Sequence, residues 1–251
     1  MKQSLTIISA LTLLAGAVHA QIVFTGNYAN DFDAMGATGT TYDAGWTGVR
    51  WGGSGPVGET LTLGVTTGSA TSGGVYNVGS SGDTDRALGV LASGATVPRF
   101  GAQFQNETGT TIADLDLAGV MEQWRTGSNA ATDEVVAFEY SLDAAGIHDA
   151  AATWVAVPAL DLNEKLTAST SAGAADGNLP DNRTDMSAAL NGINWTDGGV
   201  LTLRWSDGDA PGSDGIYALD NFAMTTVPEP STWALLALGA AGVGLRRLRR
   251  S

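Results

Sequence analysis

The feature that most constrains the fold is an alternation of apolar and polar residues in short runs bounded by glycine and aspartate. Every second residue is apolar in the run Val-Leu-Thr-Leu-Arg-Trp that ends at Trp205, and Phe100, Ala102 and Phe104 repeat the pattern. Side chains of a β-strand point alternately to its two faces, so each run predicts a strand with one buried face. Long helical periodicity is missing from residues 21–226. The pattern predicts an all-β domain, a single sandwich of antiparallel strands.

The predicted domain is strongly acidic and contains no cysteine. The chain has 12 Lys and Arg and 26 Asp and Glu residues, of which five basic and one acidic lie outside 21–226, so this range carries 7 − 25 = −18. Such a surface repels phosphates, which argues against nucleic acid as a partner. Without cysteine, disulfides, thiol catalysis and Cys-based zinc sites are excluded. About 206 residues are enough to bury a sizeable core.

The first twenty residues have the pattern of a secretory signal peptide. Lys2 provides a positive charge, an apolar stretch runs from Leu5 to Val18, and small residues precede Gln21. We therefore expect residues 1–20 to form a signal helix that is cut before Gln21. A retained N-terminal anchor is the alternative.

The last twenty-five residues, 227–251, combine three elements. Val227, Pro228, Glu229 and Pro230 form a stiff, extended turn, because proline fixes φ and removes a backbone donor. The stretch from Trp233 to Leu245 is free of charge and is followed by Arg246, Arg247, Arg249 and Arg250. This order predicts a short transmembrane helix whose basic end stops translocation. A buried C-terminal core helix is the alternative.

This tail resembles the PEP-CTERM sorting signal of Gram-negative bacteria. The resemblance implies transient membrane insertion through the C-terminal helix and recognition by an exosortase, a membrane processing enzyme thought to act near the Pro-Glu-Pro motif. It further implies export through the inner membrane, and then a location at the cell surface or in an extracellular matrix of exopolysaccharide. Such tails are also named ice-binding protein C-terminal domains, a name that does not establish ice binding.

A second resemblance concerns roughly residues 80–225. This part of the chain resembles a recurring bacterial extracellular β-sandwich module, whose layout is similar to that of jelly-roll and concanavalin-like domains. The motifs that carry this resemblance are Arg86-Ala87-Leu88-Gly89, Arg99-Phe100-Gly101, Glu122-Gln123-Trp124-Arg125, Leu203-Arg204-Trp205 and Leu219-Asp220-Asn221-Phe222. The resemblance implies a fold and no particular activity.

The acidic loop 206–215 is a candidate calcium site. Asp207, Asp209 and Asp214 lie among glycines, and Asp220 follows on the last predicted strand. Carboxylate oxygens on a flexible loop are the ligands that Ca²⁺ prefers, although the spacing is not that of an EF-hand. The alternative is a solvated turn in which the aspartates bond local backbone amides.

Catalytic patterns are weak. Glu122, Glu134 and Glu139 could supply the paired carboxylates of a glycosidase. Glu122 and Arg125 are instead expected to form a structural ion pair. His148 is the only histidine of residues 21–226, and no serine lies in a Gly-x-Ser-x-Gly sequence, which argues against serine catalysis and a His-based zinc site.

Six tryptophans in residues 21–226 raise the question of carbohydrate binding. Trp46 and Trp51 are expected to point to opposite faces of one strand, and most of the rings are expected in the core. Trp195, which follows a Gly-rich loop, is the expected exposed ligand platform. Residues 168–186 predict a polar, mobile loop. Ice binding would require a regular Thr-x-Thr repeat, which is missing.

Three hypotheses follow from the sequence. The leading one is a non-enzymatic structural or adhesive protein of the cell surface or exopolysaccharide. The second is a calcium-dependent carbohydrate-binding module, which an exposed row of tryptophans would favour. The third is a glycan hydrolase, which would need two carboxylates facing one another across a cleft.

Overall fold

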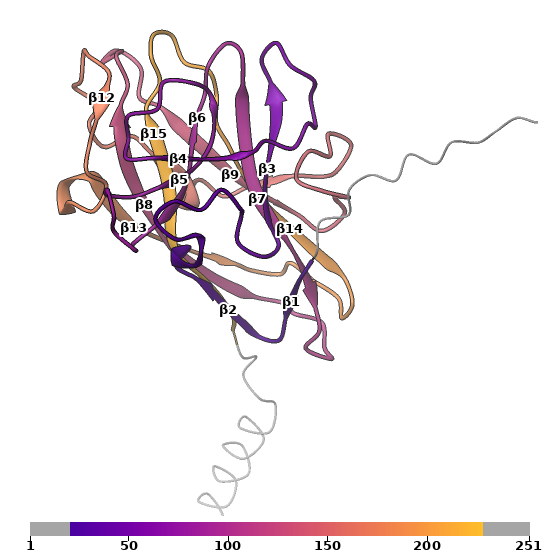
Figure 1. The fold of residues 1–251 in the computed structure, drawn as a ribbon. Helices are drawn as coiled ribbons and strands as arrows, with labels where there is room; N and C mark the ends of the chain where they lie inside the picture. Colours follow the sequence, from indigo (N-terminus) through magenta and orange to yellow (C-terminus); the bar gives the residue numbers. More distant parts are fainter. Residues whose placement is uncertain (1–20, 228–251) are drawn as a thin grey trace, which may run out of the picture.

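The computed structural model describes residues 21–227, which form two β-sheets packed face to face (Figure 1). The expected signal helix at 1–20, and the proline motif, apolar helix and arginines at 228–251, lie outside the described residues. Within 21–227, no helix is long and apolar enough to cross a membrane. The prediction of an all-β sandwich is confirmed for the described part of the chain.

The first sheet contains the strands that were clearest in the sequence. Its order is β1 (Ile22–Phe24), β7 (Val97–Asn106), β14 (Val200–Ser206), β9 (Val135–Ser141) and β10 (Val155–Ala156), with β3 (Trp46–Gly52) beside β7 and β11 (Leu162–Asn163) beside β9.

The second sheet is built around the two longest strands. Its order is β12 (Gly173–Ala174), β8 (Leu115–Thr126), β15 (Ile216–Thr226), β6 (Ala87–Leu91), β5 (Gly74–Val78) and β4 (Leu63–Thr66), with β13 (Arg183–Leu190) beside β8 and β2 (Asn27–Asn30) beside β15. Three short 3-10 helices lie in connections: η1 (Asp33–Met35), η2 (Pro158–Leu160) and η3 (Pro180–Asn182).

The expectation of purely antiparallel pairing is wrong at two places. β1 pairs with β7 and β4 pairs with β5 in parallel. Two parallel neighbouring strands start at the same end of the sheet, so the connection between them must run back along the length of the first strand. Because β4 has only four residues, the stretch 67–73 is long enough to make that return.

The core between the sheets is aromatic and centred on Trp205. Its ring lies 5.4 Å from that of Phe100, 4.6 Å from that of Phe138 and 6.0 Å from that of Trp46, measured between centroids. The indole Nε1 donates a hydrogen bond to the Leu160 carbonyl at 3.0 Å, so this polar group is satisfied inside the core. The predicted inward faces of the strands ending at Phe104 and Trp205 are thereby confirmed.

A second, smaller core lies on the outward face of the second sheet. Its members are Val78, Ala87, Leu91, Trp124, Ile216 and Ala218. Loops cover it: Ala175 donates its N–H to the Trp124 carbonyl at 2.8 Å, and a Cβ on Gly177 would come within 2.3 Å of the Trp124 ring. Glycine is required there because the backbone passes directly over the indole.

The prediction of a loop throughout 168–186 is wrong in part. This stretch contains β12 and η3, and Arg183 to Met186 already belong to β13, which pairs with β8 from Arg183 opposite Glu122. Its low apolar content reflects pairing at a sheet edge, where backbone hydrogen bonds suffice to form a strand.

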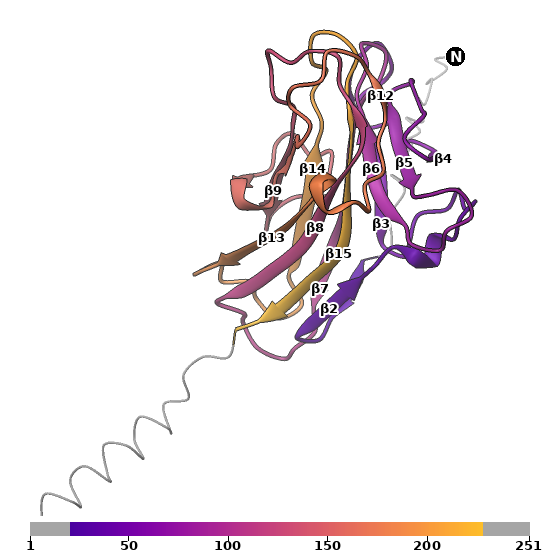
Figure 2. The same ribbon diagram turned by 90° about the vertical axis from the view of Figure 1, so that its left-hand side faces the viewer.

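The sandwich has two distinct ends. Figure 1 shows the loop that precedes β15 at one end and the last residues of β15 at the other. We call these the loop end and the tail end. In Figure 2 the last strand runs from the first to the second.

Candidate functional site

Two arginines stand side by side on the outward face of the first sheet. Arg99 lies on β7 opposite Ser206 of β14, and Arg204 lies on β14 opposite Gly101 of β7. Both side chains therefore leave the same face, as diagonal neighbours. The Ile147 carbonyl accepts a hydrogen bond from each guanidinium, at 3.1 Å from Arg99 and 3.4 Å from Arg204.

Each arginine is stacked against a tryptophan. The Arg99 guanidinium carbon lies 4.8 Å from the Trp51 ring centroid, and that of Arg204 lies 3.4 Å from the Trp154 ring centroid. We call the four residues Trp51, Arg99, Arg204 and Trp154 the Trp–Arg face. A guanidinium over an indole is an attractive cation–π contact that fixes both partners.

Trp51 is the more open of the two rings. It is 37% exposed, and its Nε1 donates to the carbonyls of Pro98 at 3.1 Å and Asp207 at 2.9 Å. Trp46, on the same strand, is buried in the core, so the prediction that these rings point to opposite faces is confirmed. The result is an exposed aromatic surface held in one orientation by its own hydrogen bonds.

Trp154 is half-buried and similarly held. Its Nε1 donates to the Asp149 carbonyl at 2.8 Å. The arginine beneath it forms an ion pair, because Arg204 Nη2 lies 2.7 Å from Glu139 Oε2 on the adjacent strand β9. Burial and the neighbouring Arg204 lower the pKa of Arg99 to about 10. Arg99 therefore carries its charge at neutral pH, and burial also lowers the pKa of Arg204, which its ion pair with Glu139 opposes.

At the loop end, the acidic loop encloses a small pocket. A cavity of about 200 Å³ is lined by Thr71, Leu91, Ala92, Ser93, Gly94, Arg125, Asp209, Gly212, Ser213 and Asp214. We call it the Arg125 pocket. Asp214 accepts the Ala210 N–H at 3.2 Å. Burial, with Glu134 and Asp209 nearby, raises the pKa of Asp214 to about 7.

Asp207 lies next to this pocket but does not line it. It is 3% exposed; one carboxylate oxygen accepts the Gly208 N–H at 2.9 Å, and the other is buried without a partner among the described residues. Burial and the nearby Asp214 raise the pKa of Asp207 well above its usual range.

The predicted calcium site does not form as expected. Asp220 lies on β15 opposite Val120, with its pKa raised to about 7 by burial and by Glu122, away from the loop that holds Asp207, Asp209 and Asp214. Across residues 21–227, no three His, Cys, Asp or Glu side chains are arranged to hold a metal ion. Two of the loop aspartates instead accept local backbone N–H groups: Asp207 from Gly208 and Asp214 from Ala210.

Trp195 is not the exposed platform that the sequence predicts. It is 1% exposed and stacks on Phe24, with ring centroids 5.2 Å apart, while its Nε1 donates to the Gly199 carbonyl at 2.9 Å. Its polar neighbours in sequence indicated a surface loop, but strand β1 covers the ring from more than 170 positions away.

The three candidate glutamates lie in three different places. Glu122 is 1% exposed on the outward face of the second sheet and accepts the Trp124 Nε1–H at 2.9 Å. Glu134 accepts the Gly215 N–H at 2.7 Å at the loop end, and Glu139 pairs with Arg204 on the other sheet. Among these three, no pair faces across a shared cleft.

The expected ion pair between Glu122 and Arg125 is wrong. Glu122 lies 3.8 Å from Arg183 of β13 instead. Arg125 is directed to its own pocket.

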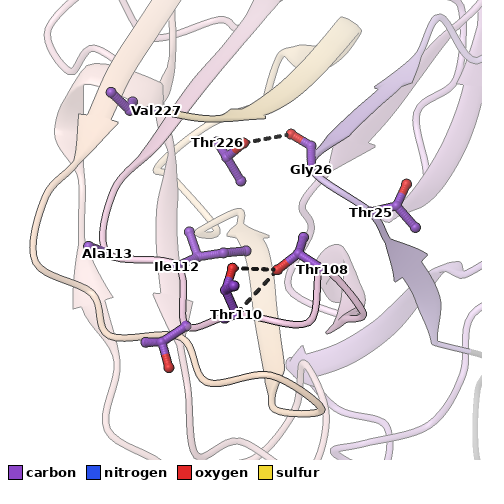
Figure 3. Close-up of a pocket in the computed structure, with 9 residues that line it drawn as sticks. Thr25, Gly26, Thr108, Thr110, Ile112, Ala113, Thr226 and Val227 are labelled. Atoms are coloured by element: carbon purple, nitrogen blue, oxygen red, sulfur yellow. Dashed lines mark hydrogen bonds between the residues drawn. The ribbon is translucent and has the colours of Figure 1, made fainter. Parts of the chain in front are cut away.

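A larger cavity lies at the tail end (Figure 3). It measures about 530 Å³ and is lined by Thr25, Gly26, Thr108, Thr110, Thr111, Ile112, Ala113, Thr226 and Val227. Thr226 donates its N–H to the Gly26 carbonyl at 2.9 Å, and Val227 donates to the Asp114 carbonyl at 3.2 Å. The chain therefore stays bonded to the domain up to the residue before Pro228.

Sequence reasoning missed the Trp–Arg face and the Arg125 pocket. One signal was present, since the alternation that ends at Trp205 places Arg204 on the outward face of a central strand. An arginine there needs a partner outside the core. Its ion-pair partner Glu139 comes from the neighbouring strand β9, whereas the Trp154 ring and the Ile147 carbonyl come from the connection 142–154, whose path the alternation does not encode.

Comparison with known proteins gives two kinds of result. Residues 226–250 match the PEP-CTERM protein-sorting motif. No curated protein matches the chain.

Solved structures similar to this chain include two xylan-binding domains and an adhesin domain. The CBM22-1 domain of Paenibacillus barcinonensis Xyn10C is 12% identical, with 84% of this chain and 99% of that chain covered and a TM-score of 0.37. The xylan-binding module CBM15 is 15% identical, with 82% and 99% covered and a TM-score of 0.37. The K2 cleaved adhesin domain of Lys-gingipain is 10% identical, with 80% and 98% covered and a TM-score of 0.41.

The motif implies processing by an exosortase, export and sorting to the cell surface. The chain thus carries a PEP-CTERM sorting motif directly behind a two-sheet β-sandwich.

Proposed function

We propose that this chain is a non-enzymatic adhesive protein of the cell surface or exopolysaccharide, whose jelly-roll-like sandwich binds polysaccharide at the Trp–Arg face. The observation that carries the proposal is Trp51, an exposed indole stacked on Arg99 and fixed by two hydrogen bonds. Calcium is no part of this proposal, since the described residues offer no metal cluster.

The chemistry of the face suits a sugar chain. A pyranose ring has apolar C–H faces that pack on an indole. Arg99 and Arg204 are each 7% exposed and already bonded within the protein, so they act by holding Trp51 and Trp154 in place, and the indoles supply the stacking surface. Both rings are already ordered, so binding loses little side-chain entropy.

The carboxylates support a role without catalysis. Glycoside hydrolysis needs an acid and a base roughly 5–10 Å apart on either side of the scissile bond. Glu139 is neutralised by Arg204, and Glu122 is buried on the other sheet. We infer that a bound chain is held and not cut.

The arrangement of the two ends also suits adhesion. Trp51 is bonded to Asp207, in the loop at the loop end, while the sorting motif begins at the tail end. A chain attached through its C-terminal side would therefore present Trp51 away from the attachment point.

Affinity electrophoresis tests the proposal. The full chain is run in native gels containing galactomannan, xylan, alginate or polygalacturonate, and we expect slowed migration in at least one gel. Trp51→Ala should weaken that retention at least about tenfold, if stacking of a sugar on one indole contributes as much as the roughly 1–3 kcal/mol of a nucleobase on an aromatic ring. Val57→Ala is the matched control, because Val57 is 67% exposed and lies outside the face.

Two outcomes would contradict the proposal. One is a wild-type chain that migrates without retardation in every gel, and the other is retention that Trp51→Ala leaves unchanged. Release of new reducing ends from a retained polysaccharide would contradict its non-enzymatic part.

A further inference from the structure

We propose that the Arg125 pocket binds the carboxylate-bearing sugar unit of an acidic polysaccharide, a uronic acid, with Arg125 holding the carboxylate. The inference rests on the proposed function and names the class of polysaccharide. It depends on a pocket that is separate from the Trp–Arg face, so the two can be tested independently.

Arg125 is an unusual cation for so acidic a protein. It is 9% exposed and lines the pocket, yet no carboxylate of residues 21–227 lies within 4.0 Å of it and its guanidinium donates no hydrogen bond to the described residues. The same residues contain 25 carboxylates and only seven basic side chains. Its guanidinium nitrogens are not among the buried polar atoms of residues 21–227 that lack a partner, so solvent reaches them and they are free to donate to an external acceptor.

A carboxylate is the acceptor that best matches a guanidinium. The planar fork of arginine donates two parallel hydrogen bonds to the two oxygens of a carboxylate or phosphate. Asp209 and Asp214 line the same cavity, and their charge disfavours a dianionic phosphate. A singly charged carboxylate meets the guanidinium with less repulsion.

The remaining walls offer partners for hydroxyl groups. The side chains of Thr71, Ser93 and Ser213 line the pocket with Asp209 and Asp214. Asp214, with a pKa of about 7, is partly protonated near neutrality and can both donate to and accept from a hydroxyl. A cavity of about 200 Å³ has room for one sugar ring. A ligand with one carboxylate and several hydroxyls on a single ring fits this set.

The pocket and the Trp–Arg face share one structural element. The loop between β14 and β15 supplies Asp209, Gly212, Ser213 and Asp214 to the pocket, and its Asp207 carbonyl holds the Trp51 indole. An acidic chain bound at one site would therefore contact the loop that shapes the other.

The test compares a charged and a neutral oligosaccharide of equal length. The full chain, labelled with ¹⁵N, is titrated with tetragalacturonate and with β-1,4-galactotetraose at low ionic strength. We expect the tetragalacturonate to shift the amide signals of Gly94 and Gly212, which line the pocket, and to bind at least about tenfold more tightly than the neutral chain. That ratio corresponds to one charge-assisted hydrogen bond.

Substitutions of Arg125 then show whether this residue causes the preference for tetragalacturonate. Arg125→Gln should remove the preference for tetragalacturonate, and Arg125→Lys, which keeps the charge but not the fork, should be intermediate. Arg50→Gln is the matched control, because Arg50 is an arginine that already has a carboxylate partner, Glu59, at 3.1 Å. The amide shifts of the wild-type chain keep the test decisive even where Arg125→Gln folds poorly.

The outcomes separate this inference from the proposed function. Equal binding of both oligosaccharides, or a preference that survives Arg125→Gln, overturns the Arg125 proposal while leaving a Trp51-dependent interaction intact. An acetylated tripeptide with a free C-terminal carboxylate that shifts the same amides at equal concentration would overturn the assignment to a sugar. A wild-type chain that binds neither oligosaccharide also overturns the Arg125 proposal, while retention in the gels decides the proposed function separately.

Discussion

The two outward faces of the sandwich both place a tryptophan beside charged residues, but the two tryptophans differ in exposure. On the first sheet, Trp51 stacks on Arg99 at the surface, and Arg204 pairs with Glu139. On the second sheet, Trp124 bonds to Glu122 beneath loops that bury both. A tryptophan beside a charged residue is thus a surface feature on one face and an internal one on the other.

The difference teaches that coverage by loops, and not residue type, decides which tryptophan remains exposed. The second face lies under the 67–73 and 175–182 stretches, so its carboxylates lose water and their pKa values rise; burial is the main cause for both Glu122 and Asp220. On the first face the connection 142–154 contacts Arg99 and Arg204, which are each 7% exposed. Its guanidinium groups keep carboxylate, carbonyl and indole partners, and Trp51 stays exposed.

The largest expected effect comes from the covered face. Trp124→Ala should lower the midpoint of thermal unfolding by about 10 °C, because deleting a buried indole costs about 3–5 kcal/mol and each kcal/mol shifts a domain of this size by roughly 2–4 °C. Differential scanning calorimetry of the full chain measures it. A shift below 3 °C would show that the loops over Trp124 do not pack as described.

A smaller effect is expected from the buried carboxylate of Asp220. Burial and Glu122 raise its folded pKa to about 7 from an ordinary value of 3.8. The folded state therefore binds a proton that the unfolded state releases between those pH values, and this group's contribution to stability falls as pH rises from 4 to 7. Asp220→Asn should raise the unfolding midpoint by about 5 °C at pH 8 and by little at pH 4.5.

The control for this comparison is on the neighbouring strand. Asp116 of β8 is exposed, so Asp116→Asn should leave the difference between the two pH values unchanged. If Asp220→Asn shifts the midpoint equally at both pH values, the carboxylate is not the titrating group that distinguishes the covered face.

Much of the fold could be predicted from local pattern. The strands that end at Phe104 and Trp205 show one apolar residue in two, because a strand buries one face, and the structure buries those residues. The opposite directions of Trp46 and Trp51 follow from the same rule. The parallel pairing of β4 with β5 could not be predicted, because it depends on the path of the intervening turn.

The candidate site was much less predictable, for a physical reason. Whether a tryptophan is exposed depends on which distant segment covers it: Phe24 covers Trp195, whereas nothing in residues 21–227 fully covers Trp51. The Arg125 pocket similarly needs the 92–94 and 209–214 stretches to meet around one side chain. Asp220 could have been separated from the calcium hypothesis, because it alternates with Leu219 within a strand and so belongs to a sheet face.

The smallest expected effect on stability is the one that sharpens the comparison most. Trp51→Ala should lower the unfolding midpoint by only about 3 °C, since a ring that is 37% exposed loses less burial than Trp124 and its two hydrogen bonds can be replaced by water. The same substitution should weaken polysaccharide retention at least about tenfold, whereas Trp51→Phe should keep more of it. A large stability loss would place Trp51 with Trp124 as an internal residue. The pair of results, little stability lost and most binding lost, is what separates a side chain kept for a ligand from one kept for the fold.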